Sequence, residues 1–163
     1  MASSPDLGGP VAKVHHSAIV THDVEASLVF WRDGLGLDVL MDHTFEGPWD
    51  ELFGGTTTEL RSLFLGDTSL PDSGIVELVD TGETGPPAPG QRDRAAGFML
   101  LSLYADLDQV LPRLATLGVG GEPTVRPVGP VRLAVVQDPN GVTVELMDTA
   151  ARQDLDVLAG GRP

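Results

Sequence analysis

The stretch DPNGVTVELMD, residues 138–148, holds a turn followed by a strand, and its last six residues repeat an earlier part of the chain. TVELMD at 143–148 corresponds to IVELVD at 75–80, with the same Val, Glu, Leu and Asp in the same order. Because side chains alternate along a strand, Glu145 and Glu77 each stand on the face opposite their apolar neighbours. A duplicated strand of this kind predicts an internal structural repeat.

The segments before each copy repeat the same order of elements. A strand at 14–20 precedes Asp23, and a strand at 97–104 precedes Asp106; both aspartates are good N-caps for the apolar helical patterns that follow them. Three strands are expected after each helix, at 37–41, 60–65 and 74–79, and then at 124–126, 132–137 and 142–147. The chain is therefore predicted to contain two modules, each made of a strand, a helix and three strands.

Composition places the boundary between the two modules. Residues 82–96, GETGPPAPGQRDRAA, contain three prolines, three glycines and no large apolar side chain, which is typical of a linker. We therefore expect a first module at 13–81 and a second module at 97–149. The first is longer because of a polar and aromatic insert at 42–59, which is either a lid over a binding site or ordinary packing at the sheet edge.

Charge and cysteine content limit the possible partners. The formal net charge is −14, with a single lysine, which argues against nucleic acid and anionic membranes and leaves a small molecule as the partner. The absence of cysteine excludes disulfides and thiolate metal sites. No apolar run could span a bilayer, and residues 1–10 lack the features of a secretory signal, so a cytoplasmic location is expected. The scarcity of lysine is typical of a high-GC bacterial genome.

The two repeated glutamates are the first candidates for chemistry. Val144 and Leu146 must face the helix of their module, so Glu145 points toward the concave face of its sheet, and Glu77 does the same in the first module. A carboxylate in such a position needs a cation, a metal or a proton, because burying it unpaired is costly. The other interpretation is that each glutamate is a solvated strand residue.

Histidines supply the second group of candidates. His15 and His16 are adjacent in a strand and face opposite sides, so at most one can join the glutamates, and alternation alone does not decide which. His22, just before the cap, is expected to be exposed to solvent. His43 lies in the insert and could reach the mouth of a pocket, as could Trp49.

HSAIVTHD at 16–23, FWRDGLGLDVL at 30–40 and DPNGVTVEL at 138–146 resemble the vicinal oxygen chelate superfamily of glyoxalases, bleomycin resistance proteins and extradiol dioxygenases. The likeness covers about residues 14–148. It implies an α+β fold of two tandem βαβββ modules whose concave mixed sheets form one pocket, and it favours a homodimer. Family members take metal ligands from the first and last strands of each module, which selects His16, Glu77 and Glu145 here.

One position departs from the family pattern. His16 lies seven residues before Asp23, and Met99 lies seven residues before Asp106. A thioether is a poor companion for two carboxylates around a hard ion, so we expect Met99 to line the substrate pocket. The remaining three ligands would suit a divalent ion such as Fe, Mn, Zn, Ni or Co and leave positions open for substrate.

The resemblance implies a metal-assisted lyase or isomerase that transfers a proton on a small carbonyl-containing metabolite, with Glu77 or Glu145 as the base. Dioxygenase chemistry is disfavoured because that branch uses a histidine at the place of Met99. Two alternatives stay open: a protein that sequesters a small molecule without catalysis, and a metal-free acid–base enzyme that uses a buried glutamate. Arg61 and Arg132 could hold an anionic substrate group, or each could pair with a surface acid.

Overall fold

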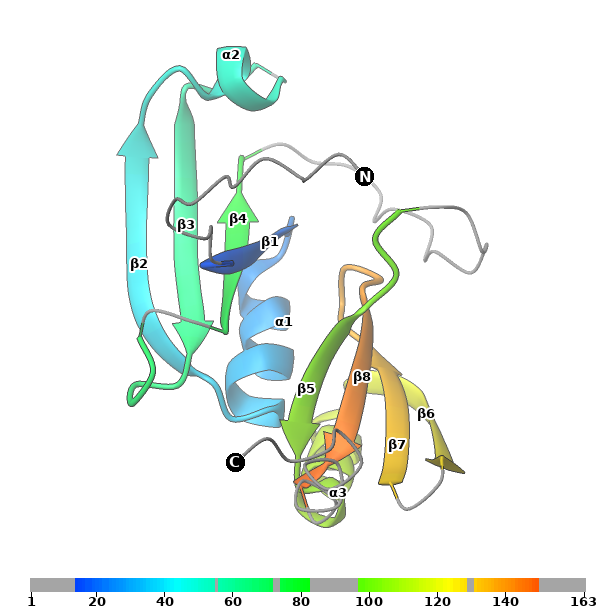
Figure 1. The fold of residues 1–163 in the computed structure, drawn as a ribbon. Coiled ribbons are helices and arrows are strands. Elements are labelled where there is room, and N and C mark those ends of the chain that lie inside the picture. Colours follow the sequence, from blue (N-terminus) through cyan, green and yellow to red (C-terminus); the bar gives the residue numbers. More distant parts are fainter. Residues whose placement is uncertain (1–13, 55, 72–73, 83–96, 129–130, 150–163) are drawn as a thin grey trace, which may run out of the picture.

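The computed structural model describes residues 14–54, 56–71, 74–82, 97–128 and 131–149, and it contains two copies of one arrangement (Figure 1). The first copy comprises β1 (His16–Val20), α1 (Val24–Leu28), the π-helix η1 (Val29–Gly34), β2 (Asp38–Glu46), α2 (Trp49–Phe53), β3 (Glu59–Gly66) and β4 (Ile75–Asp80). The second comprises β5 (Leu101–Ala105), α3 (Leu107–Leu117), β6 (Gly120–Val128), β7 (Val131–Gln137) and β8 (Thr143–Asp148). The predicted linker at 82–96 lies outside the described residues except for Gly82.

Each copy forms one four-stranded mixed sheet, in the order β1-β4-β3-β2 and β5-β8-β7-β6. The first strand of each sheet pairs in parallel with the last, and the other neighbours are antiparallel. Ala18 lies opposite Glu77 in the first sheet, and Ser102 lies opposite Glu145 in the second. The predicted α+β fold of two tandem βαβββ modules is confirmed, and the register makes the two glutamates structurally equivalent.

The predicted helix starts are confirmed by their caps. The Asp23 carboxylate accepts a hydrogen bond from the backbone N–H of Ala26, and the Asp106 carboxylate accepts from the N–H groups of Asp108 and Gln109. These bonds satisfy amides that have no partner within the first helical turn. Among the described residues no helix has the length and apolar character that a membrane span requires.

The insert at 42–59 is more regular than the sequence indicated. β2 continues to Glu46, where it still pairs with β3, and Phe45 lies opposite Leu60. The short helix α2 follows and projects beyond the end of the β2–β3 hairpin (Figure 1). The polar side chains of the insert concealed this extension because β2 is an edge strand whose residues are mostly exposed, and an edge strand lacks the apolar run expected of a buried one.

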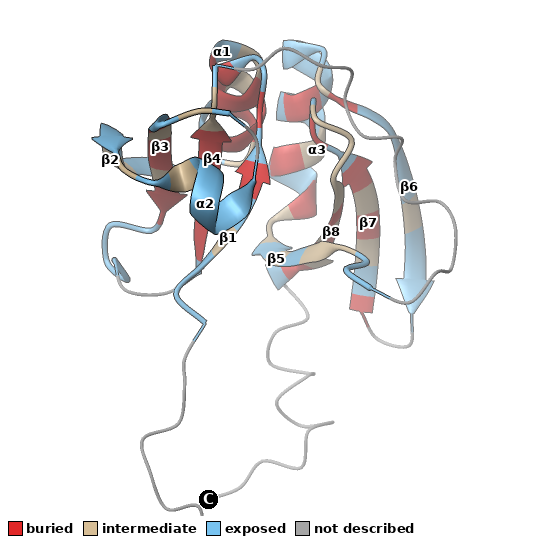
Figure 2. Cartoon of the chain, turned by 90° about the horizontal axis from the view of Figure 1, so that it is seen from above, coloured by how far each residue is buried: buried red, intermediate tan, exposed pale blue. Residues whose placement is uncertain are grey.

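One apolar core extends through both modules. η1 of the first module packs against α3 of the second, and buried residues gather between the helices and the two sheets (Figure 2). Phe30 and Trp31 of η1 and Leu114 of α3 are fully buried in this cluster. The indole N–H of Trp31 donates to the buried Asp138 carboxylate at 3.2 Å, which links the first module to the β7–β8 turn of the second. The relative placement of the modules therefore rests on both packing and a buried hydrogen bond.

Gly34 permits the close approach of η1 to α3. A Cβ at this position would lie 2.5 Å from Leu114 Cδ2. Alanine favours a helix over glycine by about 1 kcal/mol, but overpacking a core costs about 1–3 kcal/mol, so we expect Gly34→Ala to lower the free energy of unfolding. Urea denaturation measures the change. In a Leu114→Ala background the collision is gone, and the same substitution should become neutral or stabilising; an equal loss in both backgrounds would contradict this explanation.

Candidate active site

A cavity of about 680 Å³ lies on the concave face of the first sheet, under α2. Its floor comes from alternate residues of β1, β3 and β4, the ones that point away from the helices. The polar lining consists of His16, His22, Ser62, Glu77 and Thr81. The apolar lining consists of Ala18, Val20, Phe45, Trp49, Phe53, Leu60, Phe64 and Val79. All of these residues belong to the first module, and the volume falls in the range typical of small-molecule sites.

Glu77 is the most enclosed titratable group of this cavity. Its side chain is 12% exposed, and its two oxygens have separate partners. Oε1 accepts a 2.5 Å hydrogen bond from the hydroxyl of the buried Ser62, and Oε2 lies 3.1 Å from His16 Nε2. The carboxylate is therefore fixed in orientation by two strands, β3 and β1, while one edge of the His16–Glu77 pair faces the cavity.

The structure resolves the choice between the adjacent histidines. His16 shares the inward face of β1 with Ala18 and Val20, whereas His15 is absent from the cavity lining. His15 Nδ1 lies 2.9 Å from His16 Nδ1, so one ring donates to the other, and the rings meet at 84°. His16 Nε2 is thereby directed at Glu77, and a donor and an acceptor stand side by side at the cavity floor.

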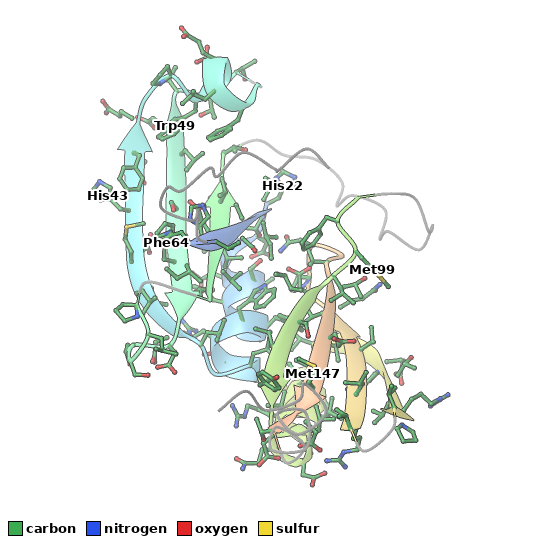
Figure 3. The ribbon with its side chains drawn as sticks, viewed as in Figure 1. His22, His43, Trp49, Phe64, Met99 and Met147 are labelled. Atoms are coloured by element: carbon green, nitrogen blue, oxygen red, sulfur yellow. The ribbon has the colours of Figure 1, made fainter. Side chains whose placement is uncertain are left out.

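Aromatic side chains surround this pair and form the rim. The Phe64 ring lies 5.3 Å from the His16 ring at the floor. Trp49 and Phe53 of α2 stack with ring centroids 5.9 Å apart, and the Trp49 indole N–H donates to the Phe45 carbonyl oxygen. Figure 3 shows Phe64 close to β1 and Trp49 near the end of the hairpin. Phe53 is 76% exposed, so the rim presents bare aromatic surface to solvent.

His22 lines the cavity, which was not expected, whereas His43 does not, although it could have reached the pocket mouth. His22 is exposed, as expected, but it also lines the cavity mouth. His43 is exposed on the edge strand β2 and packs edge-on against Phe45, which does line the cavity, while His43 itself does not (Figure 3). Ser62 and Phe64 line the cavity but were not predicted as site residues, although both occupy β3 positions opposite in phase to the core residue Leu63.

Glu145 does not lie in this cavity. It stands on the corresponding face of the second sheet, where Oε1 accepts a hydrogen bond from Ser102 Oγ at 2.8 Å. Its neighbour on β5 at the place of Ala18 is thus a serine, and no histidine accompanies it in the register. The expectation that Glu77 and Glu145 share one pocket is not met by the described residues of a single chain.

The donor arrangement bears on the metal site that the resemblance implies. His16 and Glu77 are the imidazole and carboxylate of a possible site, but nowhere among the described residues do three or more His, Asp or Glu side chains converge as metal ligands would. Catalytic zinc sites use three protein ligands. The described residues of one chain therefore do not fit the predicted His16, Glu77 and Glu145 set.

Met99 was assigned the wrong place in the repeat. It is 76% exposed, precedes β5, and lies away from the cavity (Figure 3). The β5–β8 register pairs Leu101 with Val144, whereas the β1–β4 register pairs His16 with Ile75, so Leu100 is the counterpart of His16. Counting back from the helix caps gave Met99 because the strand-to-cap connection is one residue shorter in the second module.

Both candidate arginines point to the helix-facing sides of their sheets. Arg61 binds Asp42 through two hydrogen bonds of 2.9 and 2.8 Å, which raise the pKa of Arg61 and lower the pKa of Asp42. Arg132 donates to Asp148 and to Asp108, and these hydrogen bonds raise its pKa. Neither lines the cavity, so of the two predicted roles the structure shows the pairing with an acid and not the binding of an anionic substrate group. Alternation with the core residues Leu63 and Ala134 indicates this orientation.

The chain is similar in sequence and in fold to known proteins. The family model of the Glyoxalase/Bleomycin resistance protein/Dioxygenase superfamily matches residues 13–146. The chain is 34% identical over 156 residues to the lactoylglutathione lyase-like protein terB of Aspergillus terreus, covering 85% of this chain and 76% of that protein. A Bacillus cereus glyoxalase family protein superposes with a TM-score of 0.69 at 18% identity over 87% and 97% of the two chains. Glyoxalase I of Leishmania major gives 0.64 at 19% over 91% and 95%.

Proposed function

The chain belongs to the Glyoxalase/Bleomycin resistance protein/Dioxygenase superfamily, and from this premise and the cavity we propose that it is a lyase or isomerase that moves a proton on a small carbonyl compound. The observation that carries the proposal is the His16–Glu77 pair, a hydrogen-bond donor and a carboxylate 3.1 Å apart on the floor of an apolar cavity. Proton transfer beside a carbonyl needs both groups: a base at carbon and a donor at oxygen.

Glu77, His16 and Ser62 have different roles in this proton transfer. Glu77 takes the proton from the carbon next to the carbonyl, and the electron pair moves toward oxygen to give an enolate. The His16 Nε2–H donates to that oxygen and stabilises its charge. Return of the proton from Glu77 to another carbon gives an isomer. Alternatively, the enolate re-forms the carbonyl while a carbon–carbon double bond forms and a group leaves from the next carbon with its bonding electrons; that group takes the proton from Glu77, which gives a lyase product. Ser62 acts as a positioning residue, since its hydroxyl holds Glu77 Oε1 and leaves Oε2 beside His16.

The surroundings suit this chemistry. Aromatic and aliphatic side chains surround the pair, and Glu77 is 12% exposed, which strengthens the electrostatic interactions of its carboxylate relative to bulk water. The direct test is incorporation of solvent deuterium into carbonyl compounds in D₂O, followed by mass spectrometry. Protein-dependent exchange at the carbon next to the carbonyl would support the proposal, and its absence across uncharged aliphatic and aromatic ketones, with and without added divalent ions, would refute it.

A metal, if bound, would polarise the carbonyl, and it would need a ligand beyond His16 and Glu77. A homodimer is the proposed route, because a second copy could bring its own Glu145. Since only two donors converge in the described cavity, we expect a monomeric chain to retain well under one equivalent of Fe, Mn, Zn, Ni or Co on elemental analysis. About one equivalent of metal per chain would contradict this expectation. If that metal is lost in His16→Ala and Glu145→Gln but kept in the exposed control Glu122→Gln, the site is shared between two copies of the chain.

Sequestration of a small molecule is a second candidate, favoured by the exposed aromatic rim around a carboxylate. Such a rim and a net charge of −14 also suit an organic cation. Measuring turnover distinguishes sequestration from catalysis. A sequestering protein binds its ligand stoichiometrically and catalyses no exchange, whereas an enzyme turns over many equivalents.

A further inference from the structure

We infer that the substrate held by this cavity is an uncharged, planar aromatic ketone or enone, and that it is not an anionic conjugate such as a glutathione adduct. The inference rests on the proposed function for the presence of the carbonyl. The aromatic and uncharged character comes independently, from the lining of the cavity and from the distribution of cationic side chains.

The rim of the cavity is aromatic and partly exposed to solvent. Trp49 and Phe53 are stacked within 5° of parallel, and Phe45 follows them along the wall toward Phe64 on the floor. Phe53 is 76% and Phe45 37% exposed, although large apolar side chains are usually covered. Exposed aromatic surface beside a concave site marks a ligand contact. Flat aromatic ligands match these faces because offset-stacked and edge-to-face contacts are favourable.

None of the residues that line the cavity in the described ranges is a lysine or an arginine. Arg61 and Arg132 are bound to aspartates on the opposite sides of their sheets, and the chain contains only one lysine, at position 13. A glutathione adduct carries two carboxylates, and an anion brought beside Glu77 without a fixed cation would meet repulsion and lose hydration.

Glu77 already has hydrogen-bond donors within the protein and does not need a cationic ligand. Its Oε1 already accepts from Ser62, and Oε2 has the His16 N–H beside it. A ligand that needs one donor and one acceptor at its reacting end, and apolar contacts elsewhere, matches the His16–Glu77 pair and the aromatic lining of the cavity. A ketone on an aromatic ring system has this composition, and about 680 Å³ is ample for a ligand of several rings.

The test is calorimetric titration of the full chain with four probes: 2-acetylnaphthalene, 2-naphthoate, 1-naphthylmethylamine and S-hexylglutathione. We expect the ketone to bind tightest and the naphthoate at least about tenfold more weakly, because the anion faces Glu77 without a cation. S-hexylglutathione should neither bind in this range nor displace the ketone. Tighter binding of S-hexylglutathione, the naphthoate or the amine than of the ketone would overturn the inference.

Substitutions of the lining phenylalanines test whether their rings contact the ketone. Phe64→Leu keeps the apolar volume but removes the ring face, and Phe53→Ala removes a rim ring; each should weaken ketone binding by about three- to tenfold. The matched control is Phe98→Ala, an exposed phenylalanine outside the cavity, which should change nothing. Equal effects of Phe53→Ala and Phe98→Ala would contradict the assignment.

Failure of this inference is distinguishable from failure of the proposed function. If the ketone binds at the aromatic site but shows no protein-dependent deuterium exchange at its methyl group, the ligand class stands and the catalytic proposal fails. If exchange occurs on an anionic or aliphatic carbonyl compound while the ketone does not bind, the catalytic proposal stands and the ligand class is wrong.

Discussion

Glu77→Gln is expected to slow deuterium exchange into a bound ketone by about 10²–10⁴-fold, the usual contribution of a general base. The substitution keeps the size of the side chain and leaves an amide oxygen that can still accept the Ser62 hydroxyl. It removes the negative charge that takes the proton. Rates measured by mass spectrometry at saturating ketone separate this loss from weaker binding, which calorimetry measures on the same variant.

Glu59→Gln is the matched control, since Glu59 belongs to the same sheet but is exposed and outside the cavity. It should keep the wild-type rate. Ser62→Ala should fall between the two, with a lower rate and little change in ketone affinity, because it loosens the carboxylate without removing it. A reduction of less than about threefold in Glu77→Gln would rule out Glu77 as the base, given the 10²-fold minimum expected of one.

Much of the first module's site could be predicted from sequence because its determinants are local. Strand alternation directed Glu77 inward as soon as the apolar residues of β4 were assigned to the core. The same rule places Arg61 and Arg132 on the helix-facing sides, with Leu63 and Ala134. Each arginine pairs with an aspartate there, which is the second of the two roles that the sequence left open for it.

In the second module, local sequence patterns do not determine which cavity a side chain enters. Glu145 has the predicted orientation within its own strand, but which cavity a strand face meets depends on the packing of two sheets, and alternation carries no information on that. Met99 was misplaced for a simpler reason: a repeat may differ by one residue in a connection, so hydrogen-bonded register and not residue counting identifies counterparts. In the insert, exposed edge-strand residues lacked the apolar alternation that would have revealed the continuation of β2 from the predicted end at 41 to Glu46.

Asp138→Ala is expected to lower the free energy of unfolding by on the order of 3 kcal/mol, because it removes a buried acceptor that joins the two modules. The Asp138 carboxylate accepts from Trp31 Nε1, from the Asn140 side-chain amide, and from the backbone N–H groups of Asn140 and Val142. Alanine would leave the fully buried Trp31 indole N–H without this partner. For a chain of this size the melting temperature should fall by about 6–12 °C.

The first module supplies the matched control. Asp67 occupies the corresponding β3–β4 turn and accepts from the backbone N–H and hydroxyl of Ser69, but it is exposed and has no hydrogen bond to the described residues of the second module. Asp67→Ala should therefore cost about 1 kcal/mol or less. A double-mutant cycle with Trp31→Phe isolates the link, since Asp138→Ala should cost less once the indole N–H is gone. Equal losses in both backgrounds would mean that the turn alone, and not its bond across the modules, accounts for the stability.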